Sequence, residues 1–191
     1  MNQSPEGNTT TAARVRAIQR DDVPRVWEML RGLAEYEKLT EYLTGTPAML
    51  EQALFGEGDR LRGLVAERGG RLVGYALYYP AFGSFRARWR LWLEDLYVEP
   101  AERATGTGVA LMAELAREVE RGGYYSLDWE VLDWNRPAID FYERLGAERL
   151  VREWLIYRLV GPPLESLAKR NPSDGARSAT PPEERERQAR Q

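Results

Sequence analysis

The sequence predicts a single α/β (α+β) domain in which helices cover both faces of a mixed, mostly antiparallel central sheet. A hairpin signal with two glycines indicates an antiparallel meander in the first half of the chain. A strand, a glycine-bearing turn and an amphipathic helix then follow in immediate succession over residues 91–115. Further strands are expected over residues 124–132 and 148–160, and they complete the sheet.

Two helices are expected before the hairpin. The sequence VRAI indicates a first strand, and the first helix begins near Asp21 or Asp22. Thr46 and Pro47 have the residue types of a helix start and predict the second helix. The first helix carries apolar residues on one face, namely Val23, Trp27, Leu30 and Leu33.

The hairpin is predicted from its turn residues. Residues 61–67 and 72–79 read as two strands, and they flank the sequence Arg68-Gly69-Gly70-Arg71. Residues 86–89 belong to the next loop or to a strand edge.

Composition excludes several classes of chemistry. The 191 residues contain no His and no Cys, so disulfides, zinc sites of the usual kind, thiolate nucleophiles and imidazole bases are excluded. Proton transfer must therefore use a carboxylate, a tyrosine or water. A net charge of −3 argues against nucleic acid as the main partner. The sequence shows no apolar run long enough for a membrane span and no secretion signal, so we expect a cytoplasmic protein.

Both ends of the chain differ from its middle. Residues 1–13 are rich in Asn, Thr, Gly and Pro, and residues 161–191 are polar without apolar periodicity. We therefore expect two disordered tails, the second charged and Pro-containing, around one domain of residues 14–160.

Residues 91–115 have the features of an anion site. Apolar residues at helical spacing start at Val109, so the backbone N–H groups around Gly106 and Gly108 are expected at a helix N-terminus, beside Arg103. Glycine allows close approach of a ligand and left-handed torsion angles. Two nucleotide-binding patterns fail, because Leu111 replaces the last glycine of the dinucleotide fingerprint and no Gly-Lys-Ser/Thr follows. On these residues alone, a plain turn is the alternative.

The pattern Arg-x-x-Gly-x-Gly after a Glu-Asp-bearing strand resembles the coenzyme A pyrophosphate loop of the GNAT superfamily of N-acetyltransferases. Residues 131–150 are similar to its closing strand and helix, with Asn135 as helix cap, Pro137 in the first turn and Gly146 at the end. With LAEYEKL, GYALYYPAFGSF and LEDLYV, the chain is most similar to the diamine acetyltransferase branch, including its bacterial and thialysine-acetylating members. The resemblance extends over about residues 15–160.

The resemblance implies the GNAT fold, acetyl-CoA as co-substrate, no metal and a homodimer. Tyr142 matches the family's general acid, with packing on an amphipathic helix as its structural alternative. Ala104 and Thr105 replace the common Gly-Lys, which removes a positive charge near the phosphates. The residues expected to contact the coenzyme are Leu96, Tyr97, Val98, Arg103, Ala104, Thr105, Gly106, Thr107, Gly108, Val109, Asn135 and Tyr142.

Glu94 is the candidate catalytic base. Because a carboxylate of ordinary pKa, near 4.3, is a poor base toward an ammonium, we expect Glu94 to stabilise the cation while water carries the proton away. Strand alternation directs Asp95 to the opposite face, unless a bulge reorients the pair as it does in this superfamily. On the opposite face, Asp95 is a structural or substrate-binding acid. A solvated strand edge is the alternative for both residues.

The resemblance also implies an amine pocket of acids and aromatic rings. Its expected residues are Tyr36, Glu37, Glu94, Asp95, Asp128, Trp129 and Glu130, which suit a cation. Where polyamine-selective members carry an acid, this chain has the loop of residues 81–85, followed by Arg86, Arg88 and Arg90. We therefore expect a small primary amine, and one of these arginines would suit the carboxylate of a lysine-like substrate.

The expected activity is direct transfer of an acetyl group from acetyl-CoA to a primary amine of a small molecule, such as a diamine, polyamine, thialysine or lysine-like compound. No nucleic acid or membrane partner is expected. Two alternatives stay open, namely a catalytically silent acyl-CoA-binding regulatory module and a peptide or protein N-acetyltransferase.

Overall fold

The computed structural model describes residues 12–58, 61–150 and 158–169. The chain divides into two compact units, Met1–Asp140 and Phe141–Gln191, and each is described by itself. The boundary falls inside α4 (Arg136–Arg144), so the first unit contains all the strands of the described residues and the helices that cover them.

Within the described residues, five strands form one sheet in the order β1-β2-β3-β4-β5. The first three pairings are antiparallel and β4 pairs with β5 in parallel, which confirms the mixed, mostly antiparallel sheet. The hairpin prediction is also confirmed, because Gly69 and Gly70 join β2 to β3 with φ angles of 57° and 75°. The strands are β1 (Arg14–Ala17), β2 (Arg62–Arg68), β3 (Arg71–Gly83), β4 (Arg88–Val98) and β5 (Leu127–Trp129).

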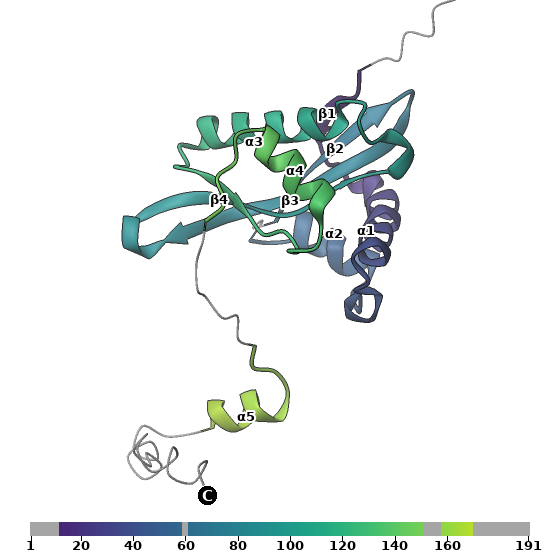
Figure 1. Ribbon diagram of the computed structural model, residues 1–191. Helices are drawn as coiled ribbons and strands as arrows, with labels where there is room; N and C mark the ends of the chain where they lie inside the picture. Colours follow the sequence, from purple (N-terminus) through teal and green to yellow (C-terminus); the bar gives the residue numbers. More distant parts are fainter. Residues whose placement is uncertain (1–11, 59–60, 151–157, 170–191) are drawn as a thin grey trace, which may run out of the picture. The chain divides into compact units, whose positions relative to one another are not determined.

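Helices cover both faces of this sheet, as expected. Helices α1 (Val23–Glu37) and α2 (Pro47–Phe55) lie on one face, and α3 (Thr107–Gly122) lies on the other (Figure 1). Thr46 caps α2, and its Oγ1 accepts a hydrogen bond of 3.2 Å from the Met49 backbone N–H. Short 3-10 turns connect these elements: η1 (Arg20–Asp22), η2 (Thr40–Tyr42), η3 (Ser84–Arg86) and η4 (Pro100–Glu102).

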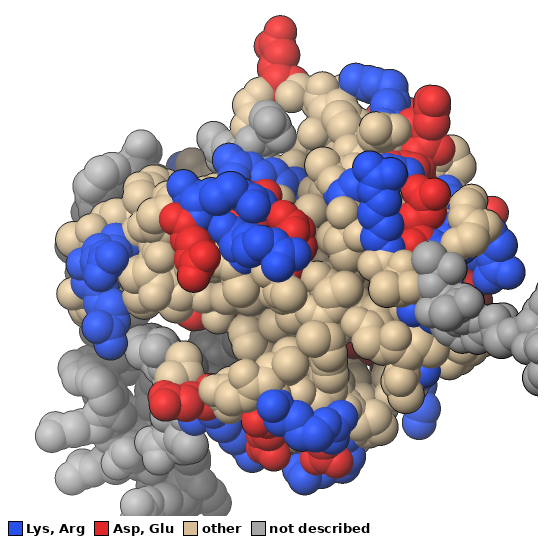
Figure 2. Space-filling view, turned by 90° about the horizontal axis from the view of Figure 1, so that it is seen from above, with Lys and Arg blue, Asp and Glu red and all other residues tan. Residues whose placement is uncertain are grey.

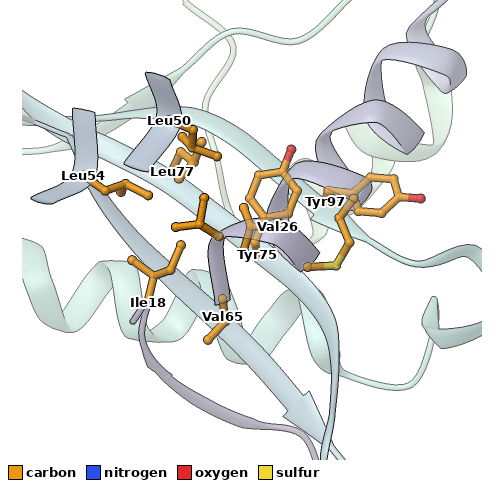
Figure 3. Close-up of a cluster of buried hydrophobic side chains, with 10 residues drawn as sticks. Ile18, Val26, Leu50, Leu54, Val65, Tyr75, Leu77 and Tyr97 are labelled. Atoms are coloured by element: carbon orange, nitrogen blue, oxygen red, sulfur yellow. The ribbon is translucent and has the colours of Figure 1, made fainter. Parts of the chain in front are cut away.

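The core on the α1 face contains aliphatic side chains from both helices and two tyrosines from the sheet (Figure 3). Tyr75 of β3 and Tyr97 of β4 are cross-strand neighbours, and their ring centroids lie 6.1 Å apart. On the α3 face, Leu111 and Leu115 are fully buried. Both faces of the central strands are therefore apolar and covered.

The charges on the surface are mixed. On the face seen in Figure 2, Lys and Arg side chains lie in groups beside Asp and Glu. On α3, for example, Arg117 and Arg121 both pair with Glu114. Neighbouring charges of opposite sign offset each other, so this face presents a mixed potential.

The second unit begins within α4 (Arg136–Arg144) and contains α5 (Pro162–Ala168). Gly146 follows α4 with a φ angle of 85°, as expected for a helix end. The strand predicted over residues 148–160 lies mostly outside the described residues. Helix α5 falls within the predicted tail, and its side chains are exposed. In the described parts of the chain, every helix is too short or too polar to cross a membrane.

Candidate active site

A β-bulge at Glu94 shapes the centre of the candidate site. In the pairing of β3 with β4, Leu77 faces Asp95 and Tyr78 faces Leu93, which leaves Glu94 as the extra residue. Glu94 and Asp95 were expected at the reacting centre. At the same two residues, the alternation of side chains between the two faces of β4 reverses.

The structure has the bulge that was expected to reorient Glu94 and Asp95, in place of plain strand alternation. Leu93 lies beside Tyr78, whose pKa is raised to about 12 by burial and then by Glu118 of α3, so this pair faces α3. Asp95 lies beside Leu77, which belongs to the core under α1. Because one extra residue reverses the alternation, Asp95 points to the α1 face.

Glu94 is held on the same face by two donors. Its Oε2 accepts hydrogen bonds from the Tyr79 hydroxyl at 3.2 Å and from the Trp92 Nε1 at 3.1 Å. Burial raises the pKa of Tyr79, and the negative charge of Glu94 adds to this effect. The carboxylate of Glu94 is thus exposed but fixed in direction. A side chain that binds a ligand needs both properties.

Asp95 lies in a much drier environment. Burial raises the pKa of its carboxyl to about 7, and the charges of Glu94 and Glu37 add to the rise. Burial also raises the pKa of Glu37 on α1. The hydroxyl of Tyr75 is buried with no hydrogen-bond partner among the described residues, and burial and then Asp95 raise its pKa. Three acids that the sequence singled out therefore share one electrostatic environment.

The predicted residues of β5 divide between the two faces of the sheet. Asp128 pairs with Trp92 and lies on the α1 face, where its Oδ2 accepts a hydrogen bond of 2.8 Å from Arg90 Nη1. Trp129 pairs with Leu93, so its side chain lies on the α3 face, away from Asp128. Glu130 follows the strand and influences the pKa of Tyr79 on the α1 face.

The turn before α3 has the backbone of an anion site. Gly106 is the N-cap with a φ angle of 87°, and Ala104 also has a positive φ, of 59°. The Ala110 N–H donates to the Gly106 carbonyl, so the N–H groups of Thr107, Gly108 and Val109 precede the first hydrogen bond of the helix. A side chain added at Gly106 would meet no atom within 4 Å, so open space lies in front of this turn.

Arg68 organises this turn, and it was not among the residues predicted for the site. From the end of β2, its Nη1 pairs with Glu102 at 3.0 Å. Its Nη2 donates to the Thr105 carbonyl at 3.4 Å and to Thr107 Oγ1 at 3.2 Å. Thr105 and Thr107 share a further hydrogen bond of 3.0 Å between their hydroxyls. The available signal for Arg68 was its position directly before the glycine pair of the hairpin. Periodicity in the sequence does not indicate which loop the side chain of Arg68 contacts.

Arg103 contacts protein groups instead of pointing freely into the open space. Its Nε donates to the Val98 carbonyl at 3.1 Å, and its guanidinium lies 4.8 Å from the centroid of the Tyr36 ring. The Tyr36 hydroxyl donates to Asn135 Oδ1 at 3.0 Å, and the buried Asn135 also caps α4. Three predicted residues, Arg103, Tyr36 and Asn135, are thereby linked into one group.

One edge of β4 remains available beside this group. Among the described residues, β5 pairs with β4 only at Leu91, Trp92 and Leu93. The Glu99 N–H donates to Val73 of β3, so strand alternation directs the polar backbone groups of Leu96 and Val98 to the other edge. An extended ligand can pair with this edge as an added strand does.

Tyr142 lies in α4 within the second unit. Its ring centroid is 5.2 Å from that of Phe141, and its carbonyl accepts hydrogen bonds from the N–H groups of Leu145 and Ala147. Its catalytic role stays a prediction.

Comparisons with known proteins agree with this geometry. The sequence profile of the Acetyltransferase (GNAT) family matches residues 24–147. Thialysine N-epsilon-acetyltransferase of Mus musculus is 33% identical over 169 residues, with coverage of 83% of this chain and 99% of the relative. L-ornithine N5-acetyltransferase of Arabidopsis thaliana is 25% identical over 213 residues, with coverage of 88% and 92%. An integron cassette protein of V. cholerae has a similar fold, with a TM-score of 0.67, 24% identity and coverage of 84% and 99%.

Proposed function

Because the chain belongs to the acetyltransferase (GNAT) family, we propose that it transfers an acetyl group from acetyl-CoA to a primary amine of a small molecule. The chain is an acyltransferase, and the proposal concerns its donor, its acceptor and the residues that act. The observation that carries it is the position of a helix N-terminus at one end of β4 and of fixed carboxylates at its bulge.

The turn before α3 suits a diphosphate. Three successive N–H groups without helical partners, on a turn that is open in front of Gly106, form a site for phosphate oxygens. The edge of β4 at Leu96 and Val98 has no backbone partner within the described residues and suits the pantetheine arm, although the Val98 carbonyl already accepts from Arg103 Nε. A backbone N–H of this edge would polarise the acyl carbonyl. When bound, acetyl-CoA supplies an activated acyl group as a thioester.

The acids at the bulge suit an amine that arrives as a cation. Glu94 presents a carboxylate that Trp92 and Tyr79 hold in place, and it attracts the ammonium. The pKa of Asp95, about 7, matches proton acceptance near neutral pH better than that of an ordinary carboxyl. We therefore assign Glu94 to binding and orienting the amine and Asp95 to receiving its proton, directly or through water.

Tyr142 is our candidate for the acid that protonates the departing thiolate. A phenol of pKa about 10 is a weak acid for this task, so its position must compensate for its acidity. Without Cys in the chain, an acyl-cysteine intermediate is excluded, which favours direct transfer while both substrates are bound.

The relatives indicate the class of acceptor. The two named above act on thialysine and ornithine, and both names describe an amino acid with a second amine. We therefore propose a small diamine or a lysine-like amine as acceptor. Homodimer formation stays a prediction that rests on resemblance, and cytoplasmic location stays a prediction that rests on the sequence pattern.

The experiment is release of thiol from acetyl-CoA in the presence of lysine, ornithine, thialysine, putrescine, spermidine or a peptide. We expect turnover with small amines, a large fall in kcat for Tyr142→Phe, and a rise in KM for the amine for Glu94→Gln. Glu118→Gln, which removes a carboxylate from α3, serves as the control. Binding of acetyl-CoA without turnover of any amine would instead indicate the silent module, and turnover of the peptide alone would indicate a peptide N-acetyltransferase.

A further inference from the structure

We propose that Arg90 binds the carboxylate of the acceptor, so that the substrate class is basic α-amino acids with a free carboxylate. This inference rests on the proposed function and specifies its acceptor. It assigns a role to a guanidinium that lies beside Asp128 and the Trp92 ring on the α1 face.

Arg90 belongs to the same face as the candidate amine site. It precedes Trp92 by two residues on β4, before the bulge, and the two side chains therefore point to the same side of the sheet. Its guanidinium lies 5.2 Å from the centroid of the Trp92 ring. The positive charge of Arg90 and the negative charge of Glu94 both influence the pKa of Tyr79, so all three groups surround the same space.

The guanidinium is fixed, and part of its donor capacity is unused. Asp128 accepts a hydrogen bond from Nη1 at 2.8 Å, and the side chains are only 27% and 16% exposed. Nε of Arg90 is buried and has no hydrogen-bond partner among the described residues. Nη2 of Arg90 also makes no hydrogen bond within the described residues and is not among the buried unpaired atoms, so it is the donor that an acceptor from outside can reach. A carboxylate suits a guanidinium, which presents donors in pairs.

The order of the charges suits a basic amino acid. The indole of Trp92 has Arg90 over its ring, and its Nε1 donates to Glu94, so one indole separates the cation from the carboxylate. The proposed acceptor carries a carboxylate for Arg90 at one end and an amine for Glu94 at the other, as ornithine and lysine do. Asp128 lies beside the first position, where the α-ammonium of the same molecule would be attracted.

The charge of Arg90 also discriminates against polyamines. A polyamine carries positive charge at both ends, and its distal end would meet the guanidinium as a like charge. Arg86 and Arg88 add positive charge nearby, but each guanidinium lies 5.7 Å from the Tyr125 ring and both residues are exposed. Arg90 is thus the partly buried arginine of the three and the one that contacts Trp92.

The test compares lysine, lysinamide and cadaverine as acceptors, with kcat/KM measured for the wild-type protein and Arg90→Gln. Lysinamide keeps both amines and lacks the carboxylate. We expect the wild type to favour lysine over lysinamide by about 10- to 100-fold, as charge-assisted hydrogen bonds allow. Arg90→Gln should lose most of this ratio while activity toward cadaverine is unchanged or higher. Arg90→Lys keeps the charge without the paired donors, and should keep an intermediate ratio.

Arg88→Gln is the matched control, since it removes a cation two residues earlier on the same strand, and it should leave the ratio unchanged. Acetyl-CoA affinity by calorimetry and thermal unfolding establish that each variant is folded; if Arg90→Gln is not, Arg90→Lys carries the comparison. An equal loss toward all three amines in the Arg90 variant, a wild type that does not distinguish lysine from lysinamide, or a selective loss in Arg88→Gln would overturn the assignment. A wild type inactive toward all three and toward other amines would overturn the proposed function itself.

Discussion

Replacing Asp95 by Asn should stabilise the protein at pH 8 and leave its stability nearly unchanged at pH 4. The carboxyl has a pKa of about 7 in the folded chain, because burial and the charges of Glu94 and Glu37 disfavour its ionised form. Its ordinary value is 3.8, so the folded and unfolded values differ by about 3 units. At about 1.4 kcal/mol per unit, ionised Asp95 costs the folded state about 4 kcal/mol.

The sign follows from proton binding. Between pH 4 and pH 7 the unfolded chain binds fewer protons at Asp95 than the folded chain, so the free energy of unfolding falls as pH rises through this range. Above pH 7 both states are ionised and the penalty is constant. The advantage of Asp95→Asn should therefore be close to zero at pH 4, about half of its maximum near pH 5.5, and about 4 kcal/mol at pH 8.

The measurement is urea unfolding of both proteins at several pH values, followed by the difference between their free energies of unfolding. Taking the difference between the two free energies of unfolding cancels the pH dependence that comes from all other titrating groups, as long as these groups titrate alike in both proteins. Glu130→Gln replaces an exposed carboxylate nearby and should follow the wild type. A difference that stays constant from pH 4 to pH 8 would refute the argument, as would a difference that falls with pH. The same variant should lose acetyl transfer, because amide cannot accept the proton.

Three further predictions concern the coenzyme side of the site. Arg68→Ala removes the hydrogen bonds to the turn at Thr107, and should weaken acetyl-CoA binding about 10-fold in calorimetry with little change in kcat. Gly106→Ala places a side chain at a φ angle of 87°, and should cost about 1 kcal/mol in urea unfolding but reduce acetyl-CoA affinity by more than 10-fold. Tyr36→Phe loses the hydrogen bond of 3.0 Å to Asn135, and should cost about 1 kcal/mol of stability.

Each of these predictions has its own control. Arg62→Ala removes an exposed arginine from the same strand as Arg68 and should leave coenzyme affinity unchanged. Gly123→Ala has a similar positive φ angle of 64° at the other end of α3, so it should cost stability without loss of affinity. Equal affinity losses at Gly106 and Gly123 would contradict the assignment of the turn, and an unchanged stability of Tyr36→Phe would show that water replaces the lost bond.

Local signals made several elements predictable. Gly69 and Gly70 specify the hairpin because both adopt positive φ angles, and Thr46 and Asn135 cap helices with their side chains. In each case the residue acts on the backbone within a few positions of its own place in the sequence. The N-terminus of α3 was predictable for the same reason.

Contacts between distant segments were not predictable in this way. Arg68 reaches Thr107 across 39 positions, and nothing in the local pattern of either residue selects the other. The predicted strand over residues 124–132 is shorter in the structure, where β5 covers Leu127–Trp129. Trp129 was grouped with Asp128 by sequence, whereas pairing with β4 places them on opposite faces.

The bulge at Glu94 shows why alternation alone is insufficient for a central strand. Leu91, Leu93 and Tyr97 are all buried, and their spacing fits one uninterrupted strand face. Because helices cover both faces of the sheet, a buried residue is equally compatible with either face, so burial does not reveal where the alternation reverses. Leu93 in fact faces α3 and Tyr97 faces α1.

The reversal has a chemical consequence, because in a regular strand Glu94 and Asp95 would lie on opposite faces. With one extra residue, both carboxylates act on the same space, where burial and then the charge of Glu94 make Asp95 harder to ionise. Glu94 remains exposed and hydrogen-bonded. Asp95 is more buried, and its burial together with the charge of Glu94 raises its pKa toward neutrality. A cationic amine bound at Glu94 would lower that pKa again. Acetyl transfer then converts the amine to a neutral amide and removes this stabilisation, which favours release of the product.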